Sequence, residues 1–364
     1  MPVDSVPASL DAITASWLTG ALRSSGMLPQ IARVESVRVD PLGASDGINA
    51  QLALLSLTYH PTPVDAPATM VAKLPHRSPS VRERLTQQGS YAREIRFYRD
   101  LSARSAMPIP RHYYADLDQK SGDTLLLLED LRDAQVGDNL RGVSDAQVII
   151  AMESIAKLHR FWWQSPRLAE LTWVSALIPD PDSYQTNAME LWARFLQKFG
   201  AQVPLALREI GEDLKRLALT VAQGLLAGPQ TLIHNDFKAD NLFFKNDRTE
   251  TRITVIDWGA IALGNPLIDV AFFLARSCSP QQRRSLENAA LSAYVTQLVE
   301  RDGVAYDLDR CTLDYRFALG HVLTRSTRVW SAMDISNERT QAVVERGVEN
   351  LTAAFVDNRV LELR

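Results

Sequence analysis

The chain has 364 residues, of which 46% are hydrophobic and 23% are charged, and its formal net charge is −4. This composition is ordinary for a globular protein of one or two domains, and it lacks the basic surface that nucleic-acid binding requires. No basic segment followed by an apolar core opens the chain, and no apolar run approaches the roughly 20 residues that span a bilayer. Cys278 and Cys311 give neither a disulfide framework nor a metal-binding spacing. We therefore expect a cytoplasmic protein with no nucleic-acid partner and no membrane span.

Residues 1–128 have the pattern of a small lobe built on a β-sheet. Helices are predicted over residues 9–22, with Ser9 as the N-cap, and over residues 81–103. Apolar runs predict strands over residues 34–39, 51–59, 69–74 and 124–128.

The turn between the first two predicted strands is rich in glycine and short polar residues, among them Gly43, Ser45 and Gly47. A turn of this kind can fold over nucleotide phosphates and bind them through backbone N–H groups. It does not match the GxGxxG pattern, so an ordinary hairpin loop remains the alternative.

Lys73 lies in the third predicted strand, where a buried ammonium group requires an anionic partner. The helix over residues 81–103 offers Glu83 and Glu94, and we prefer Glu94 because it borders the apolar stripe of that helix. A lysine held by a glutamate and aimed at the α- and β-phosphates is the arrangement of kinases. An edge-strand lysine in water is the alternative.

The fourth predicted strand ends in Glu129-Asp-Leu131, and residues 129–133 are interpreted as a hinge between two lobes. Backbone groups of Glu129 and Leu131 are candidates for pairing with an adenine edge. Residues 134–364 have helical periodicity and form the predicted second lobe. Its helices are predicted over residues 144–163, 184–199, 204–225, 266–273, 280–299, 312–332 and 338–356.

The most informative stretch runs from residue 232 to residue 274. An apolar lead-in delivers His234 and Asp236 into a loop, and Asn241 follows before a second apolar run. A third apolar run, residues 253–256, ends in Asp257-Trp-Gly. A carboxylate at the end of a buried strand is costly unless a metal or a partner satisfies it. This is the His-x-Asp-x-x-x-x-Asn and Asp-aromatic-Gly pattern of the catalytic and metal-binding loops in the protein-kinase-like fold.

Phosphoryl transfer explains why these residue types occur together. Asp236 is predicted to orient the attacking hydroxyl group or to accept its proton. The amide oxygen of Asn241 and the carboxylate of Asp257 are the oxygen ligands that Mg²⁺ prefers, with phosphates and water completing the octahedron. Lys238 is expected to reach the transferring phosphate. Any one of these residues alone would be an ordinary loop residue, but the four together favour a kinase site.

Two further polar residues are interpreted as structural support. Asp269 opens the next buried helix and is expected to brace the catalytic loop by hydrogen bonds rather than to bind the metal. His234 is expected to support the same loop. His159, on the helix that Ser144 caps, is interpreted as a core residue.

These residues resemble the aminoglycoside phosphotransferase and choline kinase superfamily, and nearly the whole chain is covered. The motifs are His234–Asn241, Asp257-Trp-Gly259 and the segment that ends at Asp269. A more particular similarity, to the ecdysteroid-kinase-like and bacterial phosphotransferase members, lies in the region of Leu18, in Lys73 and Glu94, and in the hinge Leu128-Glu-Asp-Leu131. Asn235 stands where the family usually has glycine, which we expect to be tolerated, and the turn with Gly43 matches only loosely.

The resemblance implies an α+β, protein-kinase-like fold of two lobes, with a small antiparallel β-sheet and a larger, mostly helical lobe. It implies ATP as the phosphate donor, with GTP as an alternative, and Mg²⁺ as the metal. By this likeness Asp236 is the catalytic aspartate, and Asn241 and Asp257 hold Mg²⁺. Lys73 binds phosphates with Glu94 as its partner.

The phosphate acceptor is expected to be a hydroxylated small molecule. An aminoglycoside should require a cluster of carboxylates, whereas acidic and basic residues nearly balance from residue 265 onward. Arg325 and Arg328 lie one turn apart and form either a solvated face or a site for a carboxylate or phosphate. Tryptophans at helical positions usually pack in the core, but in a pocket they would favour an apolar acceptor, such as a sterol-like or hydroxyacyl compound. These tryptophans are Trp162, Trp163, Trp192 and Trp330.

Three alternatives remain open. A protein kinase would need a long activation segment after Asp257, and the sequence leaves no room for one. A catalytically silent, nucleotide-binding or ligand-binding relative would be expected to lack at least one residue of a set that is intact here, namely Asp236, Asn241, Asp257 and Lys73. A helical interaction protein would leave the carboxylates at the strand ends unexplained.

Overall fold

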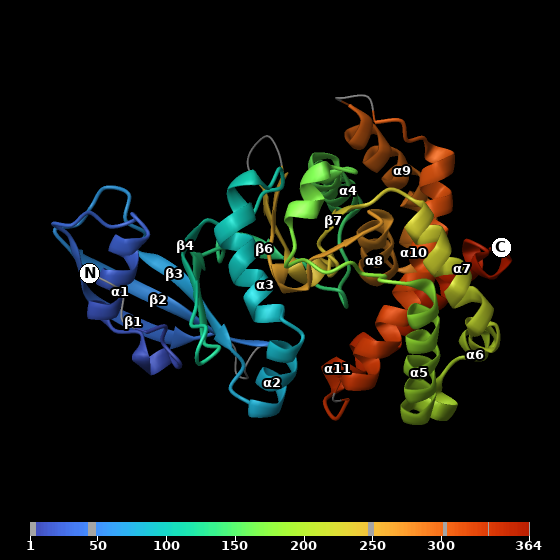
Figure 1. The fold of residues 1–364 in the computed structure, drawn as a ribbon, viewed down its shortest axis with the longest axis horizontal. Helices are drawn as coiled ribbons and strands as arrows, with labels where there is room; N and C mark the ends of the chain where they lie inside the picture. Colours follow the sequence, from blue (N-terminus) through green and yellow to red (C-terminus); the bar gives the residue numbers. More distant parts are fainter. Residues whose placement is uncertain (1–4, 43–48, 247–250, 301–303, 334, 364) are drawn as a thin grey trace. The chain divides into compact units, whose positions relative to one another are not determined.

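The computed structural model describes residues 5–42, 49–246, 251–300, 304–333 and 335–363 (Figure 1). The chain forms two compact units. Unit 1 contains Met1–Ser105, Ile109–Ala134 and Ile256–Ala260; unit 2 contains Ala106–Pro108, Gln135–Val255 and Ile261–Arg364. From the sequence we expect the Asp257 loop to belong to the C-terminal lobe, whereas in the structure it is part of unit 1.

Unit 1 is built on an antiparallel five-stranded sheet with the strand order β1-β2-β3-β5-β4. Its strands are β1 (Arg33–Pro41), β2 (Ala50–His60), β3 (Thr69–Pro75), β4 (His112–Leu117) and β5 (Thr124–Glu129). The apolar runs predict four of them, and β4 is the one that the sequence analysis leaves out. Its burial explains this, because only Tyr113 and Tyr114 of β4 are buried.

The two faces of strand β3 have different neighbours because successive side chains of a strand point to opposite faces. Met70, Ala72 and Leu74 are buried in the core that the sheet forms with helix α1 (Ala15–Ser24). Lys73 therefore lies on the other face, and its register partners are Leu52 of β2 and Leu126 of β5. This alternation allows a lysine in a strand whose other face is fully apolar.

The helices of unit 1 correct two sequence predictions. Thr14, and not Ser9, caps α1, because the chain makes a short 3₁₀ turn over Leu10–Ala12 and its helix starts only afterwards. The predicted helix over residues 81–103 is broken at Gly89, which has the left-handed backbone angle φ +68°. It consists of α2 (Pro79–Gln87), α3 (Ser90–Arg96), a π-helical turn (Phe97–Leu101) and a 3₁₀ turn (Ser102–Arg104).

Unit 2 is mostly helical, as predicted, and its longest helix, α10 (Leu308–Ala332), packs against five other helices. Ser144 caps α4 with a complete capping box, as the sequence indicates. None of the helices in the described part of the chain is long and apolar enough to cross a membrane. The other helices are α4 (Asp145–Trp162), α5 (Pro181–Phe199), α6 (Leu205–Glu212), α7 (Leu214–Ala227), α8 (Leu267–Ser277), α9 (Pro280–Val299) and α11 (Glu338–Asp357).

Unit 2 also contains two small sheets that place the central motif. Strand β7 (Thr231–Ile233) pairs with β10 (Ala262–Gly264), and β8 (Leu242–Asn246) lies between β6 (Gln135–Val136) and β9 (Thr251–Val255). The sequence predicts β8 and β9, but it does not predict β6, β7 and β10, which have only two or three residues each. The α+β class is confirmed.

Candidate active site

Strand β7 leads directly into the loop that carries Asp236. The loop's backbone is held by the buried side chain of Asp269, at the start of α8. Asp269 Oδ2 accepts a hydrogen bond from the backbone N–H of His234, and its Oδ1 accepts one from that of Asn235, both at 2.7 Å. This is the bracing contact that the sequence analysis expects of Asp269.

His159 completes the support of the loop from helix α4. Its Nε2 lies 3.2 Å from Asp269 Oδ2, and its Nδ1 lies 3.0 Å from the hydroxyl of Tyr294 on α9. All of these groups are buried, so the ring links two helices to the loop. The histidine is a core residue, as the sequence indicates.

The loop geometry explains why Asn235 can stand where glycine is usual in the family that it resembles. Its φ is +59°, in the left-handed region that most L-residues avoid. Asparagine is one of the few non-glycine residues that adopts this region readily. The left-handed position in this loop therefore accommodates asparagine.

Both carboxylate oxygens of Asp236 are bound by side chains of unit 2. Lys238 Nζ lies 3.0 Å from Oδ2, and Arg325 Nη2 on α10 lies 2.7 Å from Oδ1. Asn241 Nδ2 donates to Oδ2 at 2.9 Å and to the backbone oxygen of Asp236 at 2.8 Å. The structure thus brings together Asp236, Lys238 and Asn241, and it adds Arg325.

These neighbours keep Asp236 ionised. Burial alone would raise the pKa of its carboxyl group, but the charges of Lys238 and Arg325 outweigh burial and hold that pKa well below its usual value. A carboxylate that stays ionised at neutral pH can accept a hydrogen bond or a proton from an alcohol.

Arg325 is the residue of this site whose contact the sequence does not reveal. The sequence marks it only as one of two arginines one helical turn apart. Its guanidinium group also stacks over Phe272, with 4.8 Å between the guanidinium carbon and the ring centre. The side chain is only 18% exposed, which separates it from a solvated surface arginine.

Asn241 follows the loop in a short 3₁₀ turn, Ala239–Asn241. Its amide donates to Asp236 through Nδ2, so Oδ1 is the atom outside these two bonds. That oxygen is of the type that binds Mg²⁺. The neighbouring Asp240 has a different partner: its carboxylate accepts hydrogen bonds from the backbone N–H and the Nδ2 of Asn139.

Unit 1 contains a second cluster of charges, centred on Lys73. Its Nζ lies 2.7 Å from Glu94 Oε1 and 2.9 Å from Asp257 Oδ1. The Lys73–Glu94 pair preferred from the sequence is therefore present, and Asp257 is its third member. The side chains of Lys73 and Glu94 are 17% and 8% exposed, so water screens their charges little.

Two carboxylates around one ammonium shift the pKa values of this cluster. Burial alone would lower the pKa of Lys73, but the charges of Asp257 and Glu94 outweigh burial and raise it above its usual value. Burial raises the pKa of Glu94. The charge of Lys73 lowers this pKa, and the charge of Asp257 raises it further. At neutral pH, Lys73 stays charged.

The Asp257 loop is fixed to the helical segment that carries Glu94. The Trp258 ring stacks on that of Phe97 with their centres 4.0 Å apart and their planes 4° from parallel. A Cβ at Gly259 would lie 2.7 Å from the Ser90 hydroxyl and 3.1 Å from its backbone oxygen, so glycine is required there. Asp257 itself has φ +66°, a strained angle that this docking maintains.

The motifs of this site match those of a known family. A model of the phosphotransferase enzyme family, APH, matches residues 57–304. The chain belongs to the phosphotransferase enzyme family. The resemblance to the aminoglycoside phosphotransferase and choline kinase superfamily is thereby confirmed, while the particular likeness to its ecdysteroid-kinase-like members stays a prediction. No curated protein matches the chain.

Solved structures of this kind share its fold. A putative aminoglycoside phosphotransferase from Ralstonia eutropha JMP134 is 16% identical with a TM-score of 0.55, covering 94% of this chain and 97% of its own. Plasmodium vivax ethanolamine kinase is 11% identical with a TM-score of 0.54, covering 91% and 85%. The GDP complex of aminoglycoside 2′-phosphotransferase-IIIa is 16% identical with a TM-score of 0.53, covering 93% and 98%. The predicted protein-kinase-like fold is confirmed.

The other nucleotide contacts predicted for this phosphotransferase-family chain stay predictions. Gly43, Ser45 and Gly47 lie outside the described residues. At the end of β5, the backbone N–H of Glu129 donates to Arg111, and the backbone oxygen of Leu131 accepts from Ala134 N–H. Two of the backbone groups considered for adenine are therefore already bonded, and an adenine contact at this segment stays a prediction.

The tryptophans of the phosphotransferase fold lie mainly in its core. Trp162, Trp192 and Trp330 are 3%, 7% and 0% exposed, and the last two pack against other aromatic rings. Trp163 packs edge-on against Tyr306, with ring centres 5.0 Å apart. Core packing, the more common role, is thus the observed one for the three buried rings.

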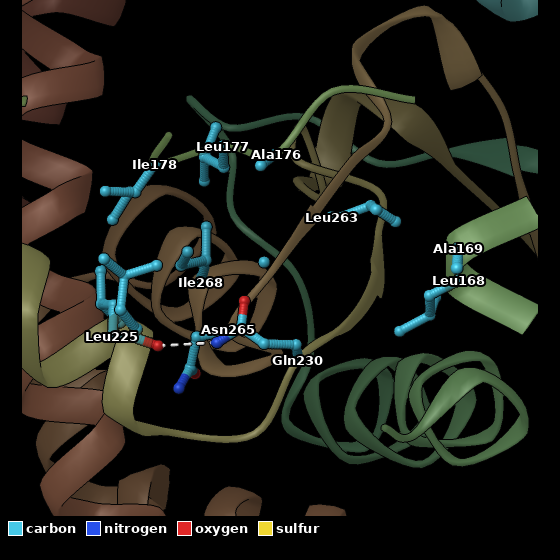
Figure 2. A pocket seen from close by; sticks show the side chains of 12 residues that line it. Leu168, Ala169, Ala176, Leu177, Ile178, Leu225, Gln230, Leu263, Asn265 and Ile268 are labelled. Carbon is cyan, nitrogen blue, oxygen red and sulfur yellow. Dashed lines mark hydrogen bonds between the residues drawn. The ribbon is translucent and has the colours of Figure 1, made fainter. Parts of the chain in front are cut away.

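Unit 2 also has a cavity of about 290 Å³ between α7, β10 and the start of α8 (Figure 2). Figure 2 shows the Gln230 carboxamide among apolar side chains, where its Nε2 donates to the Leu225 backbone oxygen at 2.9 Å. None of the predicted site residues belongs to the lining. The lining residues are Leu168, Ala169, Ala176, Leu177, Ile178, Leu225, Leu226, Gln230, Leu263, Gly264, Asn265 and Ile268.

Proposed function

We propose that this protein transfers the γ-phosphoryl group of Mg-ATP to a hydroxyl group of a small molecule. The observation that carries the proposal is the ionised Asp236 carboxylate, held within reach of Lys238 and Asn241 on a braced loop. In the reaction, a bond forms between the acceptor oxygen and the γ-phosphorus, and the bond from that phosphorus to the β,γ-bridging oxygen breaks. The acceptor's proton passes to Asp236, and ADP leaves.

Unit 1 supplies the proposed nucleotide site. Lys73 binds the phosphates, and Glu94 positions its ammonium group. The GDP complexes among the structurally similar phosphotransferases support a nucleotide as phosphate donor, and GTP is the alternative to ATP.

Magnesium is assigned to Asn241 and Asp257. These residues belong to different units, so the assignment takes its support from their sequence pattern and from their chemistry. An amide oxygen and a carboxylate suit a hard cation whose remaining ligands are phosphates and water. Bound Mg²⁺ would neutralise the charge of the phosphates; orienting the acceptor and accepting its proton is the work of Asp236.

A small acceptor is favoured over a protein acceptor by the segment that follows Asp257. Helix α8 begins at Leu267, and residues 258–266 are all that lie between them. Part of this short segment is strand β10, so it offers no activation segment on which a peptide could dock. The sterol-like or hydroxyacyl acceptor considered from the sequence loses the observation that suggested it, because three of the four tryptophans are in the core.

Calorimetric titration with ATP, with and without Mg²⁺, tests the proposal on the wild-type protein and on Asp257→Ala. We expect ATP binding that needs both Mg²⁺ and Asp257, so that Mg²⁺ strengthens ATP binding to the wild type but not to the variant. Failure to bind ATP or GTP under any metal condition would remove the enzyme assignment. Tight Mg-nucleotide binding with no transfer to any acceptor would indicate the silent relative instead.

A further inference from the structure

The immediate surroundings of Asp236 are positively charged. Besides Lys238 and Arg325, the guanidinium group of Arg276 on α8 is close enough for its charge to interact with that of Asp236. Lys238 and Arg325 contact the carboxylate from the loop and from α10, and Arg276 adds a third positive charge from α8.

Arg276 is a buried arginine, and two of its nitrogens have no hydrogen-bonding partner within the described ranges of the chain. The residue is 8% exposed, and among the described residues its Nε and Nη1 meet no hydrogen-bond acceptor. Its guanidinium group lies over the Trp330 ring, 5.2 Å from the centre. Burial lowers the pKa of Arg276 to about 10, so it is still charged at neutral pH. A buried, charged donor of this kind is costly unless a ligand satisfies it.

Arg325 is only partly satisfied as well. Its Nη2 contacts Asp236 and its Nη1 lies 3.3 Å from Asn235 Oδ1, but its buried Nε finds no acceptor in the described part of the chain. The guanidinium group is a planar fork whose N–H groups can bind a carboxylate or a phosphate through two parallel hydrogen bonds.

The carboxylates nearby do not balance these cations. Asp236 and Asp240 are the two whose charges reach Arg276, and Asp240 is hydrogen-bonded to Asn139. One turn before Arg325, the buried His321 has a pKa lowered to about 3, by burial first and then by Arg325 and Arg328. It is therefore neutral at pH 7 and adds no charge of its own, while the arginines remain in excess.

We propose that the phosphate acceptor carries an anionic group, a carboxylate or a phosphate, and that Arg325 and Arg276 bind this group beside Asp236. The inference rests on the proposed function and deepens it, since it names the substrate class of the same site. Aminoglycosides, which are polycations, would be repelled by this cluster.

The proposal also gives Arg325 a part in activation. In the structure, Arg325 occupies the Oδ1 atom of Asp236. When the acceptor's anion binds to the guanidinium group of Arg325 in place of Asp236, Oδ1 of Asp236 becomes available to the acceptor's hydroxyl group. Because the acceptor's hydroxyl group must reach Asp236, we assign an anion bound by Arg325 to the acceptor. Lys238, the other cation at this carboxylate, is left for the transferring phosphate.

The test compares four probes that carry a primary or secondary hydroxyl group. Two are anions, 4-hydroxybutanoate and glycerol 3-phosphate; 1,4-butanediol is neutral and 4-amino-1-butanol is cationic. Calorimetry measures the binding of each probe at millimolar concentration to the nucleotide-free protein, and a coupled assay measures ADP release with Mg-ATP. We expect at least one anion to bind and to raise ADP release, with the neutral and cationic probes weaker by about tenfold or more. The two anions distinguish a carboxylate from a phosphate group.

Arg325→Gln and Arg276→Gln then locate the binding. Each is expected to weaken anion binding by about tenfold while the affinity for Mg-ATP changes less than about twofold. Arg325→Lys, which keeps the charge but loses the fork, should fall in between and guards against a folding defect in the glutamine variant. Arg194→Gln is the matched control, because Arg194 is 67% exposed on α5 and its ion pair is with Glu190 of the same helix.

Several results would overturn the inference. One is that neither anion binds to the wild type, and another is that the cationic probe is used equally well or better. A third is that the variants weaken the binding of ATP instead of the binding of the anion, which would assign the arginines to the nucleotide. The proposed function fails separately, by absence of Mg-dependent nucleotide binding in the wild type. Normal ATP binding without anion preference would therefore contradict only this inference.

Discussion

The two charged clusters of this protein have opposite compositions. In unit 1, one ammonium group, that of Lys73, lies between the carboxylates of Glu94 and Asp257. In unit 2, one carboxylate, that of Asp236, lies between the cations of Lys238 and Arg325. An aspartate therefore occurs in both, once where negative charge is in excess and once where positive charge is in excess.

This difference separates the two roles better than residue type does. A cluster with surplus carboxylate attracts a cation, which suits the assignment of Asp257 to Mg²⁺. A cluster with surplus cation keeps its carboxylate ionised and attracts an anion, which suits a base that works beside a charged acceptor. Substitutions that change one cluster at a time test whether the two are independent.

The largest expected effect is that of Asp236→Asn. It removes the ionised carboxylate and leaves Arg325 and Lys238 without their partner, so we expect phosphoryl transfer to fall by about 10³-fold or more. The affinity for Mg-ATP should stay within about twofold, because the proposed phosphate contact is Lys73 in the other cluster. Single-turnover transfer and calorimetry measure the two quantities.

Asp182→Asn is the control for this substitution, since Asp182 is an exposed residue in the first turn of α5. Loss of nucleotide binding in Asp236→Asn, with Asp182→Asn unchanged, would contradict the separation of the clusters.

The next effect concerns the stability of the Lys73 cluster. Lys73→Met leaves Glu94 buried without its cation, which should reduce the free energy of unfolding by about 3–5 kcal/mol in urea titrations. The double variant with Glu94→Leu removes both charges and should recover most of this loss. A double variant that is less stable than Lys73→Met would show that burial of the charge is not the cause.

Asp269→Asn tests the brace of the catalytic loop. An amide retains one acceptor oxygen, so one of the two backbone N–H groups loses its partner and meets another donor instead. We expect a loss of about 2–3 kcal/mol in the free energy of unfolding and a lower kcat with little change in the KM for ATP. An unchanged kcat in a variant of normal fold would remove the bracing role.

The smallest effect is a dependence of stability on pH. His321 is neutral at pH 7 in the folded protein because its pKa is lowered to about 3, whereas an unfolded histidine has a pKa of about 6.5. As pH falls below 6.5, His321 binds a proton in the unfolded chain but not in the folded protein. The free energy of unfolding therefore decreases toward pH 3. Between pH 6.5 and 5 this contributes a loss of about 2 kcal/mol.

The difference between wild type and His321→Gln isolates this contribution from that of the carboxylates. Urea titrations across this pH range should show a flatter profile in the variant. Parallel profiles would mean that His321 binds its proton in the folded protein, and hence that the surrounding positive charge is weaker than inferred.

The parts of the fold that the sequence predicts are those with local patterns. The strands with five or more apolar or alternating residues and the capped helices follow from periodicity, and the Asp236 to Asn241 spacing follows from the chemistry of one loop. Strands β7 and β10 have three residues each, which is too short for a period to show. Gly89 interrupts a helical pattern that otherwise reads as continuous, because one left-handed residue leaves the apolar stripe on both sides intact.

Some contacts of the site could likewise be predicted from the sequence, and others could not. The pair of Lys73 and Glu94 could be predicted, since a buried strand lysine requires an acid and the following helix offers few. The contact between Asp236 and Arg325 could not, because 89 residues separate them and no motif links them. Arg276 gives no signal either, since an arginine in the last turn of a helix is common at exposed C-termini.

The stack of Phe97 on Trp258 has a consequence for how related sequences can differ. The ring of Phe97 stands in a π-helical turn directly after the helix of Glu94, and Trp258 directly follows Asp257. A smaller side chain at either position would open a gap between the two segments and shift one carboxylate relative to the other. In an alignment of homologues, we therefore expect positions 97 and 258 to change together, and more slowly than the tryptophans of the helical unit.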